Sequence, residues 1–188
     1  MHKIKKLAKR YKLKIIEDAA QSIGSRYKGK MSGAWGDIGC FSAHPLKNLN
    51  AIGDSGYLTT NSKKIYNYIY DLKNHGMTNR NIVRNFGYVS RMDNLQAAIL
   101  NFRFSKLNKT IKARRENALL YRQFIKSKKV FIPENKFEEF NTFHTFVIQV
   151  PKRDELRKYL KKNKIETSIH YPKPIHLQPA AKFLNYKI

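Results

Sequence analysis

The sequence predicts an α/β protein whose larger part is followed by a smaller α+β part. Short apolar runs between turn residues, at 13–16, 38–43 and 56–60, are typical of buried strands. Segments with apolar residues at helical spacing alternate with these runs, which is the order expected of an α/β fold. The last third combines two strand-like runs with one helix, and this order predicts a separate α+β unit.

The first thirty residues contain a helix, a strand and a glycine-rich excursion. Apolar residues at helical intervals predict an amphipathic helix over residues 1–12 with lysines on its solvent-exposed face. The strand at 13–16 ends in Glu17 and Asp18, and ligand sites in α/β sheets are usually built just past the carboxyl ends of strands. An isolated acidic pair more often only begins a turn. Residues 25–30 predict a hairpin or loop excursion.

Lys47 lies in the connection between the next two predicted strands, at 38–43 and 56–60. An amine attacks an aldehyde only as the free base, and partial burial or a nearby cation favours that form. A turn beside a sheet edge supplies such a setting. Most lysines are solvated surface charges, so neighbouring motifs have to single this one out. Lys47 is therefore a hypothesis for the group that carries the chemistry.

Two kinds of segment follow the second of these strands. Residues 62–75 predict a helix, with Asn61 or Ser62 as its N-cap. The polar, glycine-punctuated residues 77–88 predict a long surface loop, and such loops are usually functional or ordered by a partner subunit.

The remaining elements are mostly helical. Apolar residues at helical spacing begin near residue 92 and resume over 111–124. This pattern predicts a long helical stretch that connects the two domains. Residues 130–133 and the alternating run 143–150 predict strands, and 153–163 predict one more helix.

Composition restricts the classes of protein. The chain has 188 residues, 41% hydrophobic residues and a formal net charge of +25. That charge would attract nucleic acid or anionic membranes without any specific site, but the basic residues are spread along the whole chain rather than gathered in one stripe. No membrane span is predicted, and a single cysteine, Cys40, cannot form an internal disulfide. We expect a cytoplasmic protein, with no membrane and no specific nucleic acid as partner.

Six motifs, which run through almost the whole chain in one order, resemble those of the nucleotide-sugar aminotransferases of the DegT/DnrJ/EryC1/StrS family. Any one of them alone would be weak evidence, but their order and number make the resemblance specific. The motifs are Glu17-Asp18-Ala19-Ala20-Gln21, Phe41-Ser42-x-x-Pro45-x-Lys47-Asn48-Leu49, Gly53-Asp54-x-Gly56, Asn74-His75-Gly76, Gly87-x-x-Ser90-Arg91-Met92-Asp93-x-Leu95-Gln96-Ala97-Ala98 and Thr167-x-x-His170-Tyr171-Pro172-x-Pro174-x-His176.

This resemblance implies a fold type I, aspartate aminotransferase-like enzyme that uses pyridoxal 5′-phosphate (PLP). It implies a large domain with a mostly parallel sheet, of which residues 1–110 are the C-terminal part, and a partial small α+β domain over 111–188. Lys47 corresponds to the Schiff-base lysine. The reaction implied is transamination of a nucleotide-linked keto sugar, with glutamate as amino donor, for amino-sugar and cell-surface polysaccharide biosynthesis in a homodimer.

The resemblance also assigns residues to the cofactor and the substrate. Asp18 would hold the pyridine nitrogen protonated, Gln21 would bond the phenolic oxygen of the ring, and Ser42 would donate to the phosphate. His44 and His176 correspond to positions near the substrate. The pair formed by His170 and His176 lacks a third ligand, so no metal site is predicted.

Two features depart from the family pattern. Val89 stands where an asparagine commonly reaches the PLP phosphate of the neighbouring subunit, and valine cannot make that hydrogen bond. Family members are longer at both ends, so the chain resembles a fragment that carries the lysine without most of the phosphate cradle. The alternatives to an active enzyme are an inactive fragment, a non-catalytic partner of a full-length relative, or a basic nucleic-acid-binding protein.

Overall fold

The computed structural model describes residues 1–185 and divides the chain into two compact units. The first unit consists of Met1–Ser127 and Ile132–Ile148, and the second of Lys128–Phe131 with the chain from Gln149 onward. The predicted domain ranges, 1–110 and 111–188, stay a prediction.

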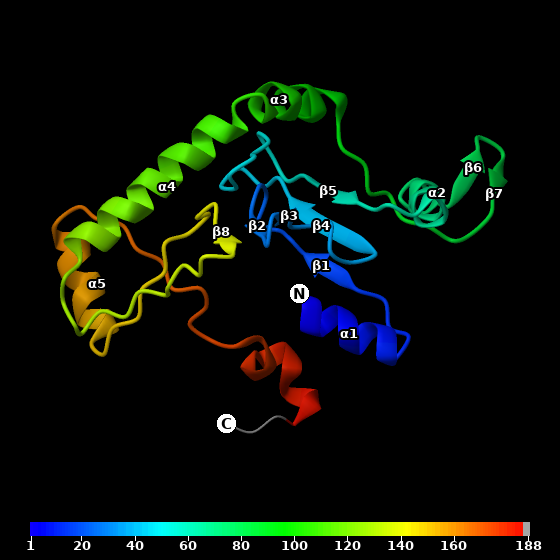
Figure 1. Ribbon diagram of the computed structural model, residues 1–188. Coiled ribbons are helices and arrows are strands. Elements are labelled where there is room, and N and C mark those ends of the chain that lie inside the picture. Colours follow the sequence, from blue (N-terminus) through cyan, green and yellow to red (C-terminus); the bar gives the residue numbers. More distant parts are fainter. Residues whose placement is uncertain (186–188) are drawn as a thin grey trace. The chain divides into compact units, whose positions relative to one another are not determined.

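A three-stranded sheet in the order β1-β4-β5 lies in the first unit (Figure 1). β1 (Ile16–Asp18) runs parallel to β4 (Ile38–Ser42), and β4 is antiparallel to β5 (Gly56–Thr59). Both strands around Lys47 are therefore confirmed. The strand predicted at 13–16 is displaced toward the C-terminus, because the amide of Ile15 is bound by the Asp37 carboxylate at 2.9 Å rather than by a neighbouring strand.

The predicted hairpin is present as β2 (Arg26–Tyr27) and β3 (Lys30–Met31). Its turn contains Lys28 and Gly29, both with positive φ. A third short strand, β8 (Glu139–Phe140), pairs with β2 in the antiparallel sense.

The helices of the first unit follow the predicted periodicity. They are α1 (His2–Arg10), α2 (Lys63–Leu72), α3 (Asn94–Phe104) and α4 (Leu107–Phe124). The Ser62 hydroxyl caps α2 by accepting the Ile65 amide at 3.3 Å, as one of the two predicted caps. The loop expected at 77–88 is partly a hairpin, formed by β6 (Met77–Asn79) and β7 (Ile82–Val83).

The hydrophobic core of the first unit brings the segment around Lys47 together with α3 and α4. Its buried members are Ala43, Leu49, Ala51, Leu100, Leu107 and Ile111. Half of them come from the connection that holds the lysine. Burial of these side chains fixes the start and the middle of that connection.

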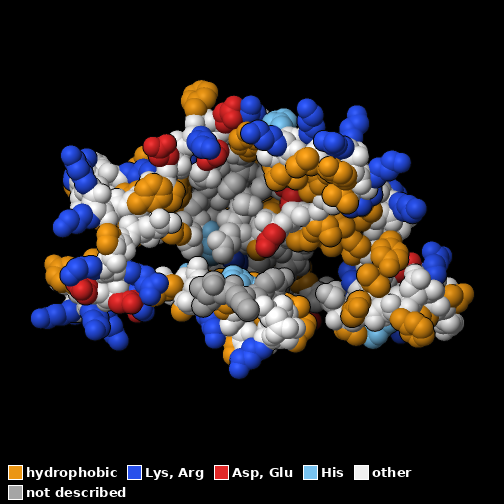
Figure 2. Space-filling view, turned by 90° about the horizontal axis from the view of Figure 1, so that it is seen from below, with side chains coloured by type: hydrophobic (Ala, Val, Ile, Leu, Met, Phe, Trp, Pro, Cys, Tyr) orange, Lys and Arg blue, Asp and Glu red, His pale blue; other side chains and the backbone are white. Residues whose placement is uncertain are grey.

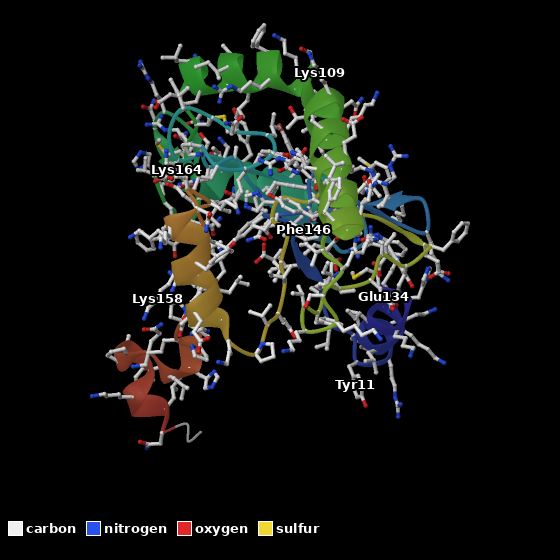
Figure 3. The ribbon with its side chains drawn as sticks, turned by 90° about the vertical axis from the view of Figure 1, so that its left-hand side faces the viewer. Tyr11, Lys109, Glu134, Phe146, Lys158 and Lys164 are labelled. Carbon is white, nitrogen blue, oxygen red and sulfur yellow. The ribbon has the colours of Figure 1, made fainter. Side chains whose placement is uncertain are left out.

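The strand predicted at 143–150 is wrong, and side chains of α4 explain why. Arg114 and Arg115 donate hydrogen bonds to the carbonyls of Asn141, Phe143 and His144, which are therefore not available to a neighbouring strand. Phe146 instead lies beside α4 (Figure 3), and its ring stacks on Tyr121 with 4.8 Å between centroids.

The second unit contains one long helix, α5 (Arg153–Lys162), and two 3₁₀ helices, η1 (Ile175–Leu177) and η2 (Pro179–Leu184). The predicted helix at 153–163 is thus confirmed. The strand expected at 130–133 is reduced to one bridge, between Phe131 and Gln149.

Lysine and arginine side chains are spread over the face shown in Figure 2, with hydrophobic side chains between them. This distribution agrees with the spacing of basic residues along the sequence. Within residues 1–185, no helix is both long and apolar enough to cross a membrane.

Asp37 provides a pH-dependent link between β1 and β4. The hydrogen bond from the Ile15 amide, and then the Lys14 ammonium at 3.1 Å, lower the pKa of the Asp37 carboxyl below its ordinary value of 3.8. A carboxyl group with a lowered pKa stabilises the fold fully above that ordinary value and loses its contribution as the pH falls through the folded-state pKa. We expect Asp37→Asn to flatten the acid limb of the free energy of unfolding, measured in urea at a series of pH values. An unchanged acid limb would contradict this role.

Candidate active site

The connection between β4 and β5 is closed by backbone hydrogen bonds around Lys47. The Ala43 amide donates to the Ser55 carbonyl, and the Ala51 amide donates to the Ala43 carbonyl, both at 2.8 Å. Lys47 is half-buried within this closed segment. Lys47 therefore lies on a turn that is fixed by backbone hydrogen bonds.

His44 organises the turn just before the lysine. Its carbonyl accepts the Lys47 amide at 2.8 Å, and its Nδ1 accepts the Leu46 amide at 3.2 Å. Its own amide donates to Ser42 Oγ at 3.2 Å, and its Nε2 lies 3.8 Å from Asp54. The sequence-based role of His44 in substrate binding stays a prediction, whereas its structural role is visible in these contacts.

Two further contacts that sequence reasoning missed hold the turn in place. Asn48 is only 6% exposed, and its side-chain amide donates to the Thr142 carbonyl at 3.1 Å. Arg103 of α3 donates to the carbonyls of Asn50 and Ala51, at 2.7 and 3.2 Å. No sequence signal identified these pairs, because their members lie about a quarter to a half of the chain apart.

Asp18 and Ser42 lie at the same edge of the sheet. Parallel pairing places Asp18 beside Cys40, so β1 and β4 both end near this edge, and the Lys47 turn follows directly. Asp18 is exposed, and its Oδ1 accepts the Ala20 amide at 3.1 Å. Gln21 follows three residues later and is also exposed. Asp18 and Ser42 thus end neighbouring strands, with Gln21 and Lys47 a few residues after them in the chain, and a shared site for the four stays a prediction.

The polar side chains near these strand ends fit the expected cofactor. Within the described part of the chain, neither Lys47 nor Asp18 has an ion-pair partner, so the amine and the carboxylate remain available. A carboxylate for a protonated ring nitrogen, an amide for a phenolic oxygen, a hydroxyl for a phosphate and an amine for an aldehyde make up a complementary set.

The other predicted positions lie elsewhere in the chain. His176 belongs to η1 of the second unit, and its relation to Lys47 stays a prediction. Val89 is exposed and forms a backbone bridge with Asn74, so its role toward a neighbouring subunit also stays a prediction. Residues 1–185 contain no cluster of three or more histidine, cysteine or carboxylate side chains that could hold a metal ion.

A groove of about 520 Å³ lies between α4 and the strands β2, β3 and β8. Ile111, Arg115 and Phe140 are among its lining residues, and none of the predicted site residues is among them. The candidate site therefore lies at the carboxyl ends of β1 and β4, and not in this groove.

Comparison with known proteins connects this arrangement to one family. The sequence pattern described as the DegT/DnrJ/EryC1/StrS aminotransferase family matches residues 1–187. A pleiotropic regulatory protein of Geobacillus stearothermophilus is 38% identical over 100% of this chain and 51% of its own. The dTDP-3-amino-3,6-dideoxy-alpha-D-galactopyranose transaminase of Aneurinibacillus thermoaerophilus is 40% identical over 96% of this chain and 50% of its own.

Solved structures show the same likeness. The crystal structure of S. venezuelae DesV is 34% identical and superimposes with a TM-score of 0.92, covering 96% of this chain and 49% of DesV. A DegT/DnrJ/EryC1/StrS aminotransferase from Brucella abortus gives the same TM-score and identity, with 48% of that chain covered. The chain thus spans about half the length of the relatives it matches, and the predicted partial fold type I architecture is confirmed.

Proposed function

The chain belongs to the DegT/DnrJ/EryC1/StrS aminotransferase family, and from this premise we propose that it supplies the lysine and the ring-binding groups of a PLP-dependent sugar aminotransferase. The observation that supports the proposal is the parallel pairing of β1 and β4, in which Asp18 pairs with Cys40 just before β4 ends and the Lys47 turn begins. Transaminases of dTDP- and UDP-linked sugars among the relatives support a nucleotide-linked keto sugar as substrate.

PLP is the cofactor of this family, and when bound it supplies an electron sink for the substrate's reacting carbon. Lys47 would hold the cofactor through its Nζ and, once displaced by the amino donor, use the same nitrogen to move a proton. Asp18 would keep the ring nitrogen protonated, and Gln21 and Ser42 would orient the ring and the phosphate. His44 would stabilise the lysine turn by accepting the amides of Leu46 and Lys47.

Several finer features are part of the proposal. Glutamate is the proposed amino donor, the assembled enzyme is proposed to be a homodimer in the cytoplasm, and its product is proposed to enter cell-surface polysaccharide biosynthesis. The names of the sugar transaminases among the relatives favour neither a nucleic-acid-binding protein nor a non-catalytic partner. Since the relatives are about twice as long, binding by this chain is a sharper test than turnover.

Chemical trapping tests the proposal. The purified chain would be treated with less than one equivalent of PLP, reduced with borohydride and mapped by peptide mass spectrometry. Because Lys47 is half-buried on a turn fixed by backbone hydrogen bonds, just after the strand that pairs with β1, we expect the label on the peptide that contains Lys47. A label distributed over many exposed lysines, with no preference for Lys47, would overturn the proposal. Glutamate added before the reduction should decrease the label if glutamate is the donor.

A further inference from the structure

Glu17 uses its carboxylate to bind three backbone amides of the loop between β3 and β4. Its Oε2 accepts the Gly33 amide at 2.8 Å, and its Oε1 accepts the amides of Gly36, at 2.6 Å, and Trp35. Hydrogen bonds to an ionised acceptor are roughly twice as strong as those between neutral groups. Glu17 is therefore a firm link between β1 and this loop.

The loop that Glu17 binds is itself fixed to the sheet. The Thr59 hydroxyl of β5 donates to the Gly33 carbonyl at 2.8 Å, and Trp35 is only 7% exposed. A Cβ on Gly39 of β4 would lie 2.6 Å from the same Gly33 carbonyl, so the loop packs directly on the strand backbone. Through these contacts, Glu17 connects β1 to β4 and β5 on one face of the sheet.

Asp18 is the next residue of the same short strand. Because successive side chains of a strand point to opposite faces, the Glu17 and Asp18 carboxylates leave β1 in opposite directions. Glu17 is half-buried against the loop, whereas Asp18 is exposed at the strand end. β1 has only three residues, Ile16–Asp18, and pairs with β4 alone. The short ladder with β4 and the Asp37–Ile15 contact hold the strand backbone, and the Glu17 carboxylate adds the side-chain contacts that resist its rotation.

We propose that Glu17 is a positioning residue, which sets the place of the Asp18 carboxylate at the cofactor edge by tying β1 to the amides of residues 33–36. The proposal rests on the proposed function for its consequence in PLP binding, but the positioning itself is a property of the chain without cofactor. In this proposal the two acidic residues have different roles: Glu17 fixes the strand, and Asp18 binds the cofactor.

The first test measures amide hydrogen exchange without PLP. In Glu17→Gln, one of the two acceptor oxygens becomes an NH₂ group, which cannot accept a backbone amide. We expect the amides of Ala19 and Ala20, which donate to Cys40 and Asp18, to exchange about tenfold faster in this variant. Unchanged exchange at these two amides would overturn the positioning role.

Asp37→Asn is the matched control, because Asp37 also binds a backbone amide beside β1, that of Ile15, but accepts none of the three amides that Glu17 binds. We expect this variant to leave the exchange of Ala19 and Ala20 within about twofold of the original chain. Equal acceleration in both variants would show that any loosening of β1 has the same effect, and would contradict a specific role for Glu17.

The second test uses the spectrum of bound PLP at a temperature where both variants are folded by circular dichroism. We expect Glu17→Gln to weaken PLP binding about tenfold and to move the pH midpoint of the visible band, with neither change in Asp37→Asn. A loss of stability alone would not move this midpoint. If the unaltered chain shows no bound-PLP band, the proposed function fails, while the exchange result still decides the positioning role. A normal midpoint in Glu17→Gln would overturn the inference.

Discussion

Replacing Lys47 with alanine is expected to abolish the visible absorbance band that PLP acquires when it is bound to this chain. The band depends on a covalent link between the cofactor and an amine, and alanine has none. The turn itself should persist, because it is held by the amides and carbonyls of Ala43, Ala51 and Ser55 rather than by the lysine side chain. The measurement is an absorbance titration with PLP, together with circular dichroism to verify the fold.

Lys73→Ala is a matched control for this experiment. Lys73 is also half-buried and lies in the same compact unit, where its ammonium lies 5.4 Å from the centroid of the Tyr70 ring. We expect this variant to keep the band. A band of equal strength in Lys47→Ala would show that PLP reacts with surface lysines in general, as a lysine-rich chain allows, and would remove Lys47 from its proposed role.

The elements predicted most accurately are those specified by local sequence. α2 and α5 begin and end within three residues of their predicted bounds, because apolar spacing, and in α2 the Ser62 cap, act within a turn or two of helix. β4 and β5 also lie within a residue of their predicted bounds, because apolar runs bounded by turn residues are a local signal as well.

Elements that depend on distant partners could not be predicted in this way. Residues 143–150 alternate as a strand does, yet the arginines of α4, about 30 residues earlier, bind carbonyls from residues 141–144. β1 starts three residues later than predicted, because Asp37 takes the amide of Ile15. Periodicity describes which side chains favour burial, but it does not say which group will pair with a given carbonyl or amide.

The candidate site shows the same division. Family motifs predict Asp18, Gln21, Ser42 and Lys47 as site residues, and parallel pairing places Asp18 beside the strand that ends at Ser42. The residues that hold this edge were missed, because Asn48 finds its partner 94 residues away and Glu17 finds its three amides across a loop. Candidate ligand-binding residues can thus be predicted from motifs, whereas the residues that support them depend on the fold.

Gly39→Ala is expected to lower the free energy of unfolding by about 3 kcal/mol, the largest effect on stability that we predict. A Cβ at this position would lie 2.6 Å from the Gly33 carbonyl oxygen and 2.8 Å from Thr59 Oγ1, and it would lie closer still to the Gly33 Cα. Two of these neighbours are backbone atoms, which cannot rotate away as a side chain can. The loop must therefore move, and its amides would then leave the Glu17 carboxylate.

Gly29→Ala separates this steric effect from a general cost of replacing glycine. Gly29 has a φ of 77°, but no atom lies within 4 Å of the position that a Cβ would take there, so alanine should cost only about 1 kcal/mol of backbone strain. Urea unfolding of both variants compares the two costs. Because the contacts of Gly39 with Gly33 lie on the Glu17 face of the sheet, Gly39→Ala should also loosen PLP binding, while Gly29→Ala should not. Equal losses of stability in the two variants would show that loop packing on β4 is not what holds this edge.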